Sequence, residues 1–230
     1  MKYLFILLFI SNCYCQDNFN QFDQNGLKHG FWKGLFEASK RVRYEGKFDH
    51  GVEIGVFNFY EDSDGKILLS TRTFSNNGTE AITVFFDKNK IIISQGKTVN
   101  KLHEGEWKYF HEGTTALMIT ENYIKGKLIG SRKVYYLNQQ IAEESTYKNG
   151  KKEGVYKKYT EQGTLLEESI FKNGEYNGLA IFRDSDGNIA SKGPFVNGLK
   201  KGKWQFFEGG KLKKEQILPV VKKMANRKKK

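Results

Sequence analysis

The sequence predicts an all-β protein, an elongated antiparallel β-meander of about eight tandem hairpin repeats. One observation is an internal period of about 24 residues. Three copies of the repeated phrase are YKNGKKEGVYKKYTEQG at 147–163, FKNGEYNGLAIFRDSDG at 171–187 and FVNGLKKGKWQFFEGG at 195–210. A second observation is the alternation of apolar and polar residues within each copy, which is typical of β-strands. A third is a closing Asn-Gly pair, because these residues tolerate the positive φ angles of tight hairpin turns.

One glycine marks the register of each unit, and a slot that is usually aromatic follows two residues later. These register glycines are Gly30, Gly55, Gly105, Gly130, Gly154, Gly178 and Gly202. Ile82 occupies the corresponding slot of the third unit. Glycine inside a strand often marks the close approach of another group to the backbone. We therefore expect an aromatic ring of a neighbouring strand to lie across each register glycine.

The aromatic slot forms a second series along the chain. It contains Trp32, Phe57, Trp107, Tyr156 and Trp204, while Arg132 and Ala180 depart from the pattern. Residues in equivalent strand positions point to one face of a sheet, so a row of rings is predicted. The row could stack a sugar or peptide partner. The favoured interpretation is that the rings pack across neighbouring strands and hold the sheet together.

The pattern N-G-x-x-x-G-x-[WFY]-x-x-[YF], followed by an acidic residue and Gly, is seen here as NGKKEGVYKKYTEQG and more loosely as NGLKKGKWQFFEGG. It resembles the MORN repeat (membrane occupation and recognition nexus) in its variant bacterial form. The resemblance covers about residues 25–215. It implies a twisted, single-layer antiparallel sheet used for binding or scaffolding. Some relatives with this variant repeat are described as antitoxin-like.

The chain divides into four segments. Residues 1–15 read as a secretory signal peptide, because one Lys precedes a short apolar run that is followed by small and polar residues. A lead follows at 16–24, the MORN-like array at 25–215 and a basic tail at 216–230. Both cysteines lie within the first segment, so cleavage after Cys15 leaves a chain without cysteine. We expect an extracytoplasmic protein, secreted or periplasmic; lipid anchoring through Cys13 is the less favoured alternative.

The net charge of +12 belongs mostly to the C-terminal end. Residues 211–230 hold nine Lys and Arg against one Glu, which leaves the repeats nearly balanced. A basic tail of this kind does not predict nucleic-acid binding by the repeats. It does allow a weak electrostatic contact with an anionic membrane.

Candidate catalytic and metal-binding groups are few. The DSDG sequences at 62–65 and 184–187 lack the closing Glu of a calcium loop and fall where other units have a turn. The histidines His29, His50, His103 and His111 lie in or beside turns and show no helical zinc-ligand spacing. Adjacent carboxylates such as Glu143 and Glu144 point to opposite faces of a strand, so they cannot act together on one substrate. No cofactor and no metal are expected, and the protein is predicted not to be an enzyme.

The function predicted from the sequence is that of an exported, non-catalytic repeat protein. Its sheet surface would act as a protein-binding or scaffolding module for a protein partner. One alternative is a membrane-surface binder that uses the basic tail and a repeat face on anionic lipid. Another is an antitoxin-like partner protein.

Overall fold

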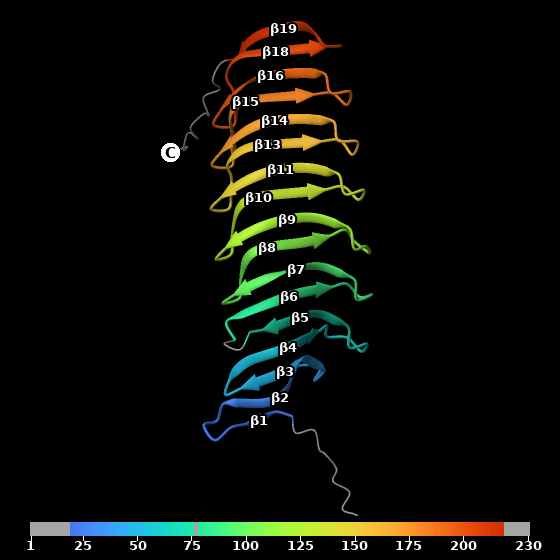
Figure 1. Cartoon of the computed structure of the whole chain (residues 1–230), viewed down its shortest axis with the longest axis vertical. Coiled ribbons are helices and arrows are strands. Elements are labelled where there is room, and N and C mark those ends of the chain that lie inside the picture. The colour runs from blue at the N-terminus through green and yellow to red at the C-terminus, as the bar shows by residue number, and fades with distance from the viewer. Residues whose placement is uncertain (1–18, 76–77, 219–230) are drawn as a thin grey trace, which may run out of the picture.

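The computed structural model describes residues 19–75 and 78–218, and every regular element in these ranges is a strand. Neighbouring strands pair antiparallel, so the hairpins stack into one long ladder (Figure 1). The short β12 and the following β13 both pair with β11, and β17 and β18 both pair with β16. The strands are β1 (Gln21–Phe22), β2 (Lys28–Leu35), β3 (Val42–Asp49), β4 (Val52–Tyr60), β5 (Leu68–Phe74), β6 (Glu80–Phe86), β7 (Ile92–Val99), β8 (Leu102–Phe110), β9 (Leu117–Ile124), β10 (Lys127–Tyr135), β11 (Ile141–Lys148), β12 (Lys151–Lys152), β13 (Gly154–Tyr159), β14 (Leu165–Lys172), β15 (Glu175–Arg183), β16 (Ile189–Val196), β17 (Leu199–Lys200), β18 (Gly202–Glu208) and β19 (Lys211–Leu218).

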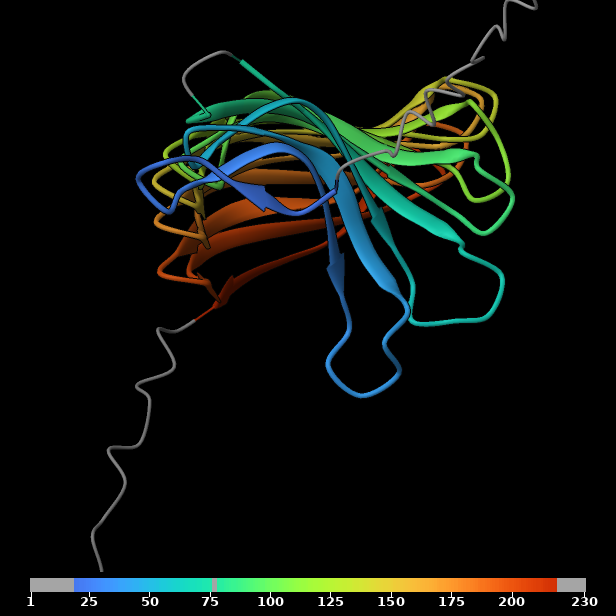
Figure 2. The ribbon, with the colours of Figure 1, turned by 90° about the horizontal axis from the view of Figure 1, so that it is seen from below.

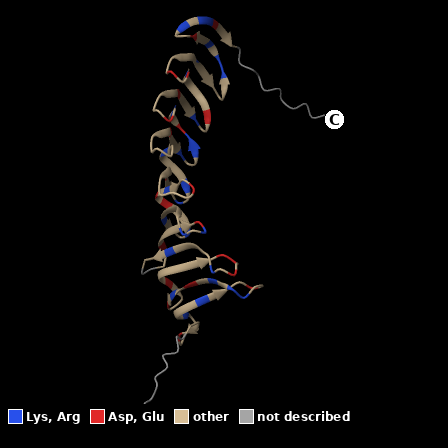
Figure 3. Cartoon of the chain, turned by 90° about the vertical axis from the view of Figure 1, so that its right-hand side faces the viewer, with Lys and Arg blue, Asp and Glu red and all other residues tan. Residues whose placement is uncertain are grey.

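The predicted fold class is confirmed. The ladder begins at β1 and ends at β19, at opposite ends of its long axis (Figure 1). Seen along that axis, the strands change direction progressively, which is the twist that L-residues impose on a sheet (Figure 2). From the side the sheet is a single curved layer, and both basic and acidic residues are scattered along its length (Figure 3). No helix among the described residues is long and apolar enough to cross a membrane. The predicted signal peptide at 1–15 and most of the tail at 216–230 lie outside the described residues.

The register glycines do not have the role that the sequence suggested. A Cβ built on Gly30, Gly55, Gly105 or Gly130 meets no atom within 4 Å, so no ring lies across them. They adopt positive φ, for example +67° at Gly105, and Gly55, Gly105 and Gly130 lie at β-bulges. In the β7–β8 pair, Lys97 faces Glu104 and Gly96 faces Trp107, which leaves two residues of β8 unmatched. Glycine is required there because the bulge places one residue in the left-handed region.

The third unit shows why its register slot lacks glycine. The β5–β6 pairing runs without a register shift, so this hairpin has no bulge. Ala81 faces Thr98 in the way that Gly105 faces Tyr123, and Ala81 therefore occupies the register position. The assignment of Ile82 to that slot was wrong by one residue, and its side chain is 51% exposed. Without a bulge the position needs no left-handed φ, and alanine is tolerated.

A different set of glycines lies beneath the aromatic rings. A Cβ on Gly46 would come 2.3 Å from the Phe57 ring, on Gly96 2.4 Å from the Trp107 ring and on Gly193 2.5 Å from the Trp204 ring. The close approach of ring and backbone was thus predicted for the wrong strand of each hairpin. We call them the ring-contact glycines. Because they lack a side chain, the aromatic rings can lie flat on the neighbouring backbone, and this packing gives the single-layer sheet a core.

We expect Gly105→Ala to lower the free energy of unfolding by about 1–2 kcal/mol, the cost of a left-handed residue with a Cβ. Gly105→Asn should cost less, because Asn tolerates this region. Urea denaturation followed by circular dichroism measures both. Ala81→Gly is the matched control: at this slot without a bulge, glycine should be the less stable residue by about 0.5–1 kcal/mol. Equal preferences at the two slots would contradict the bulge explanation.

Candidate functional site

The face that carries the aromatic row is largely occupied by its own packing. The five rings of the slot are buried: Trp32 is 9% exposed, Phe57 0%, Trp107 1%, Tyr156 7% and Trp204 0%. The indole Nε1 of Trp107 donates to the carbonyl oxygen of Lys97 at 2.9 Å, and that of Trp204 to Pro194 at 3.0 Å. With ring faces covered and N–H groups bonded, the packing interpretation fits these residues better than a stacking platform does.

Where the aromatic slot holds Arg132, the row is interrupted by an ion pair. The Arg132 Nε lies 2.8 Å from Glu121 Oε1 on one neighbouring strand, and its Nη1 lies 4.0 Å from Glu143 Oε2 on the other. Glu143 and Glu144 have different partners, as expected for side chains on opposite faces: Glu144 accepts a hydrogen bond from the Tyr159 hydroxyl at 3.2 Å. Arg132, Glu121 and Glu143 are paired with one another. These ion pairs therefore replace ring packing at this slot, and the carboxylates do not form an acid–base pair.

Two tyrosines and a lysine extend this polar stretch of the row. The pKa of Tyr176 is raised to about 12 by burial and by donation of its hydroxyl to Glu167 at 2.8 Å. Burial lowers the pKa of Lys152, whose Nζ lies 4.0 Å from the centre of the Tyr156 ring. Tyr176 is therefore a protonated donor across the physiological range, and Lys152 lies over the face of the Tyr156 ring.

The opposite face of the sheet carries exposed apolar side chains, and sequence reasoning missed them. Each follows a register position by one residue or faces such a residue across a strand pair. We call the first group the N-terminal apolar row: Phe31 (60% exposed), Val56 (53%) and Ile82 (51%). The C-terminal apolar row is Val155 (49%), Ile170 (40%), Leu179 (50%) and Ile217 (78%). Between the two rows the same positions hold Glu106, Asn122, Ser131 and Thr146.

The N-terminal apolar row borders a shallow groove of about 450 Å³. Phe19, Phe31 and Val56 line it together with the charged pair Lys33 and Glu45. The Lys33 Nζ lies 3.7 Å from the centre of the Phe19 ring and 3.8 Å from Glu45 Oε1. An apolar floor with a charged margin is the usual composition of a protein-binding surface.

The turn interpretation of DSDG agrees with the structure. The Asp184 carboxylate accepts the backbone N–H groups of Asp186 at 3.1 Å and Asn188 at 2.9 Å, which closes the turn on itself. In the first copy, Asp62 and Asp64 pair with Arg41 of the neighbouring hairpin. The histidines behave less simply: His29 and His50 come from different hairpins, yet their rings lie side by side with centres 4.8 Å apart.

These features define a class, a tandem β-hairpin repeat protein with one closed and one open face. The MORN repeat variant model matches residues 128–149 and 152–173, which correspond to the β10–β11 hairpin and to the unit formed by β12, β13 and β14. The chain therefore contains MORN-variant repeats, and the resemblance seen in the sequence is confirmed. MORN repeats are commonly protein- or membrane-binding modules, and the family is generally non-catalytic.

No curated protein matches the chain. Similar solved structures include a GtfA/B complex, at 13% identity and a TM-score of 0.28 over 39% of this chain and 18% of that one. Another is the pneumococcal O-GlcNAc transferase GtfA with UDP and GlcNAc, at 16% identity and a TM-score of 0.28 over 43% of this chain and 19% of that one. A third is a mutant of S. aureus TarM with fondaparinux, alpha-GlcNAc-glycerol and UDP, at 10% identity and a TM-score of 0.23 over 54% of this chain and 19% of that one. The chain thus spans about a fifth of each of these proteins, and at such TM-scores the likeness carries no conclusion about function.

Proposed function

We propose that this protein is an exported, non-catalytic scaffold that binds a protein partner through the face opposite the aromatic row. The observation that carries the proposal is the pair of exposed apolar rows. In a single-layer sheet one face is closed by ring packing, and the other keeps apolar side chains in water along two separate stretches. Contiguous exposed apolar surface of this kind is typical of interaction sites. The apolar stretch after a single Lys at the N-terminus supports export.

The C-terminal apolar row is the stronger binding candidate. Val155 faces Ile170 across the β13–β14 pair, and Leu179 faces Pro194 across β15–β16, so the row continues over four strands. Lys157, Lys192 and Lys203 lie on the same face within two residues of it along their strands. Lys203 pairs with Glu215, and Lys157 faces Glu168 across the β13–β14 pair, so the margin of the row carries both charges. The partner that fits is a protein surface with an apolar centre and a polar margin of mixed charge.

We expect the double variant Val155→Asp with Leu179→Asp to lose capture of the partner from the envelope fraction of the source cell. Both side chains are about half exposed, so the melting temperature should change little. Cross-linking with mass spectrometry identifies the captured protein and the contact residues. The control is Ser131→Asp with Thr146→Asp, which adds the same charge to the polar stretch of this face. Equal capture by both double variants, or cross-links only to the ring face, would exclude this surface.

A membrane-surface role has its own supporting observation. Strand β19 places Lys211, Lys213 and Lys214 at the exposed C-terminal end of the ladder. Binding to anionic vesicles that falls with salt and disappears when these three lysines are replaced by Gln would favour this function over protein binding. Vesicle binding that the Val155→Asp, Leu179→Asp variant abolishes would instead assign lipid contact to the repeat face.

A further inference from the structure

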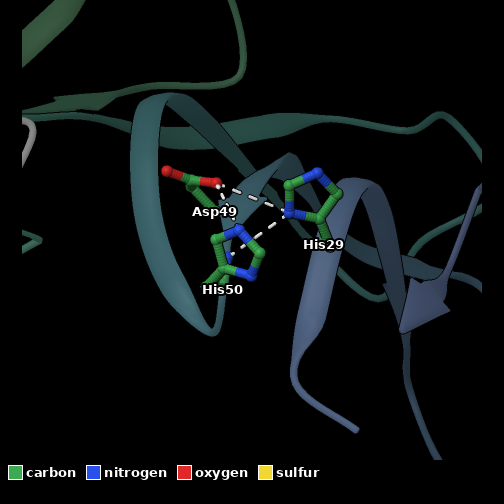
Figure 4. A group of neighbouring side chains, drawn as sticks. All are labelled: His29, Asp49 and His50. Carbon is green, nitrogen blue, oxygen red and sulfur yellow. Dashed lines mark hydrogen bonds and ion pairs between the residues drawn. The ribbon is translucent and has the colours of Figure 1, made fainter. Parts of the chain in front are cut away.

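Three potential metal ligands meet at the N-terminal end of the ladder. His29 lies near the start of β2, Asp49 ends β3, and His50 is the first residue of the β3–β4 turn. His29 Nδ1 is 3.5 Å from Asp49 Oδ1, and His50 Nε2 is 3.8 Å from the same oxygen. One ligand atom from each residue lies within 4.8 Å of the others, and the three side chains converge from two neighbouring hairpins (Figure 4).

A fourth residue fixes the imidazole of His50. Asp23 Oδ2 lies 2.5 Å from His50 Nδ1, which holds the ring with its Nε2 on the side of Asp49. Asp23 is itself held, because its Oδ1 accepts the backbone N–H groups of Asn25 at 2.8 Å and Leu27 at 2.9 Å. A carboxylate that orients the distal nitrogen of a histidine is the usual outer contact of a metal ligand.

We propose that His29, Asp49 and His50 bind a divalent transition-metal ion, with zinc the best chemical fit. Two imidazoles and one carboxylate are a normal zinc ligand set, with bonds of about 2.0–2.2 Å. Tetrahedral ligands at that radius are about 3.4 Å apart. Two of the separations here, 3.5 Å and 3.8 Å, are close to that value, and all three residues are exposed. Calcium and magnesium fit poorly because they prefer all-oxygen sites.

The local charge also favours a dication. The carboxylates of Asp23 and Asp49 stand beside two imidazoles, and the bound ion would offset both negative charges. In the structure His29 Nδ1 has two long contacts of 3.5 Å each, with the His50 backbone N–H and with Asp49 Oδ1. The ion therefore replaces a weak hydrogen bond with a coordinate bond. Three protein ligands leave one coordination position for water or a partner side chain.

The position of the site suggests what the ion does. Strand β1 has two residues and forms the N-terminal edge of the ladder within the described residues 19–75 and 78–218. The contact between Asp23 and His50 already joins the β1–β2 turn to the β3–β4 turn. The ion would add a second link, between His29 of β2 and the residues Asp49 and His50 at the end of β3. Trp32 extends the link, since its Nε1 donates to the carbonyl oxygens of Gln21 and His29. The ion would thus staple the terminal units of the array.

The test is calorimetric titration of zinc into untagged, chelator-treated chain comprising residues 16–230. We expect one saturable site per chain. His29→Gln and His50→Gln should each weaken binding at least tenfold, and Asp23→Asn by about 10–100-fold through loss of the orienting contact. His111→Gln is the control, because that histidine lies in a distant turn and bonds Tyr135. Cobalt substitution should give the visible absorption of a tetrahedral ion.

Several results would overturn the proposal. They are the absence of saturable zinc binding, unchanged affinity in His50→Gln, or a loss in His111→Gln as large as that in His50→Gln. Asp49→Asn provides a second ligand variant of nearly the same shape, so a folding defect in one variant does not leave the question open. Circular dichroism of each variant confirms that the sheet is intact. Partner capture is a separate readout, so the scaffold proposal stands or falls independently.

Discussion

Trp107→Ala is expected to lower the free energy of unfolding by about 3–5 kcal/mol. The ring is 1% exposed and lies across Gly96 of the preceding strand. It stacks on His103 with ring centres 3.7 Å apart, and its Nε1 donates to Lys97. Truncation removes all of these contacts and leaves a cavity that a one-layer sheet cannot fill from behind. Urea denaturation followed by circular dichroism measures the loss.

The loss of stability in Trp107→Ala should appear first as local opening of the sheet around the defect, and only then as unfolding of the whole chain. In a repeat ladder each unit contacts only its neighbours, so the strands that flank a defect open first. Amide exchange in Trp107→Ala should accelerate most in β7, β8 and β9. The control is Phe31→Ala, which removes a ring that is 60% exposed and should cost less than about 1 kcal/mol. A Trp107→Ala chain as stable as the Phe31→Ala chain would show that the aromatic row does not hold the sheet.

The hairpin architecture could be read from the sequence because it depends on local chemistry. Asn149, Asn173 and Asn197 do adopt positive φ, at 51°, 51° and 49°, as their turn positions require. Aromatic residues two apart fall on one face whatever the rest of the chain does. Such features repeat in every unit, so eight weak signals reinforce one another.

The role of the register glycines could not be read in this way. Whether Gly105 is free of side chains or covered by a ring depends on the pairing register, and the two unmatched residues of each bulge are not visible in one strand alone. For the same reason, the sequence placed the register position of the third unit at Ile82, whereas the structure places it at Ala81.

The candidate sites differ in how far the sequence could have revealed them. The apolar rows had a signal: Val155 and Leu179 each follow a register glycine and repeat with the period. The cluster of His29 and His50 had only a weak one, since their separation of 21 residues is close to one period but matches no helical ligand spacing. Side chains from adjacent turns meet in a stacked ladder, and a search for short motifs does not detect them.

The ring-contact glycines lead to the last prediction: the effect of Gly96→Ala on stability should change sign when the ring above Gly96 is removed. Gly96→Ala should cost about 1–3 kcal/mol in the native chain, because the new Cβ would lie 2.4 Å from the Trp107 ring. The φ of Gly96 is not in the left-handed region, so the backbone itself accepts alanine. In a Trp107→Ala background the ring is gone, and the same substitution should stabilise by about 0.4–1 kcal/mol through the unfolded state. A double-mutant cycle in urea measures the coupling.

Gly130→Ala is the control, because its φ of +63° makes the substitution unfavourable by a similar amount in both backgrounds. A Gly96→Ala cost that persists without the ring would mean that the strands themselves, and not the aromatic row, require glycine at this position.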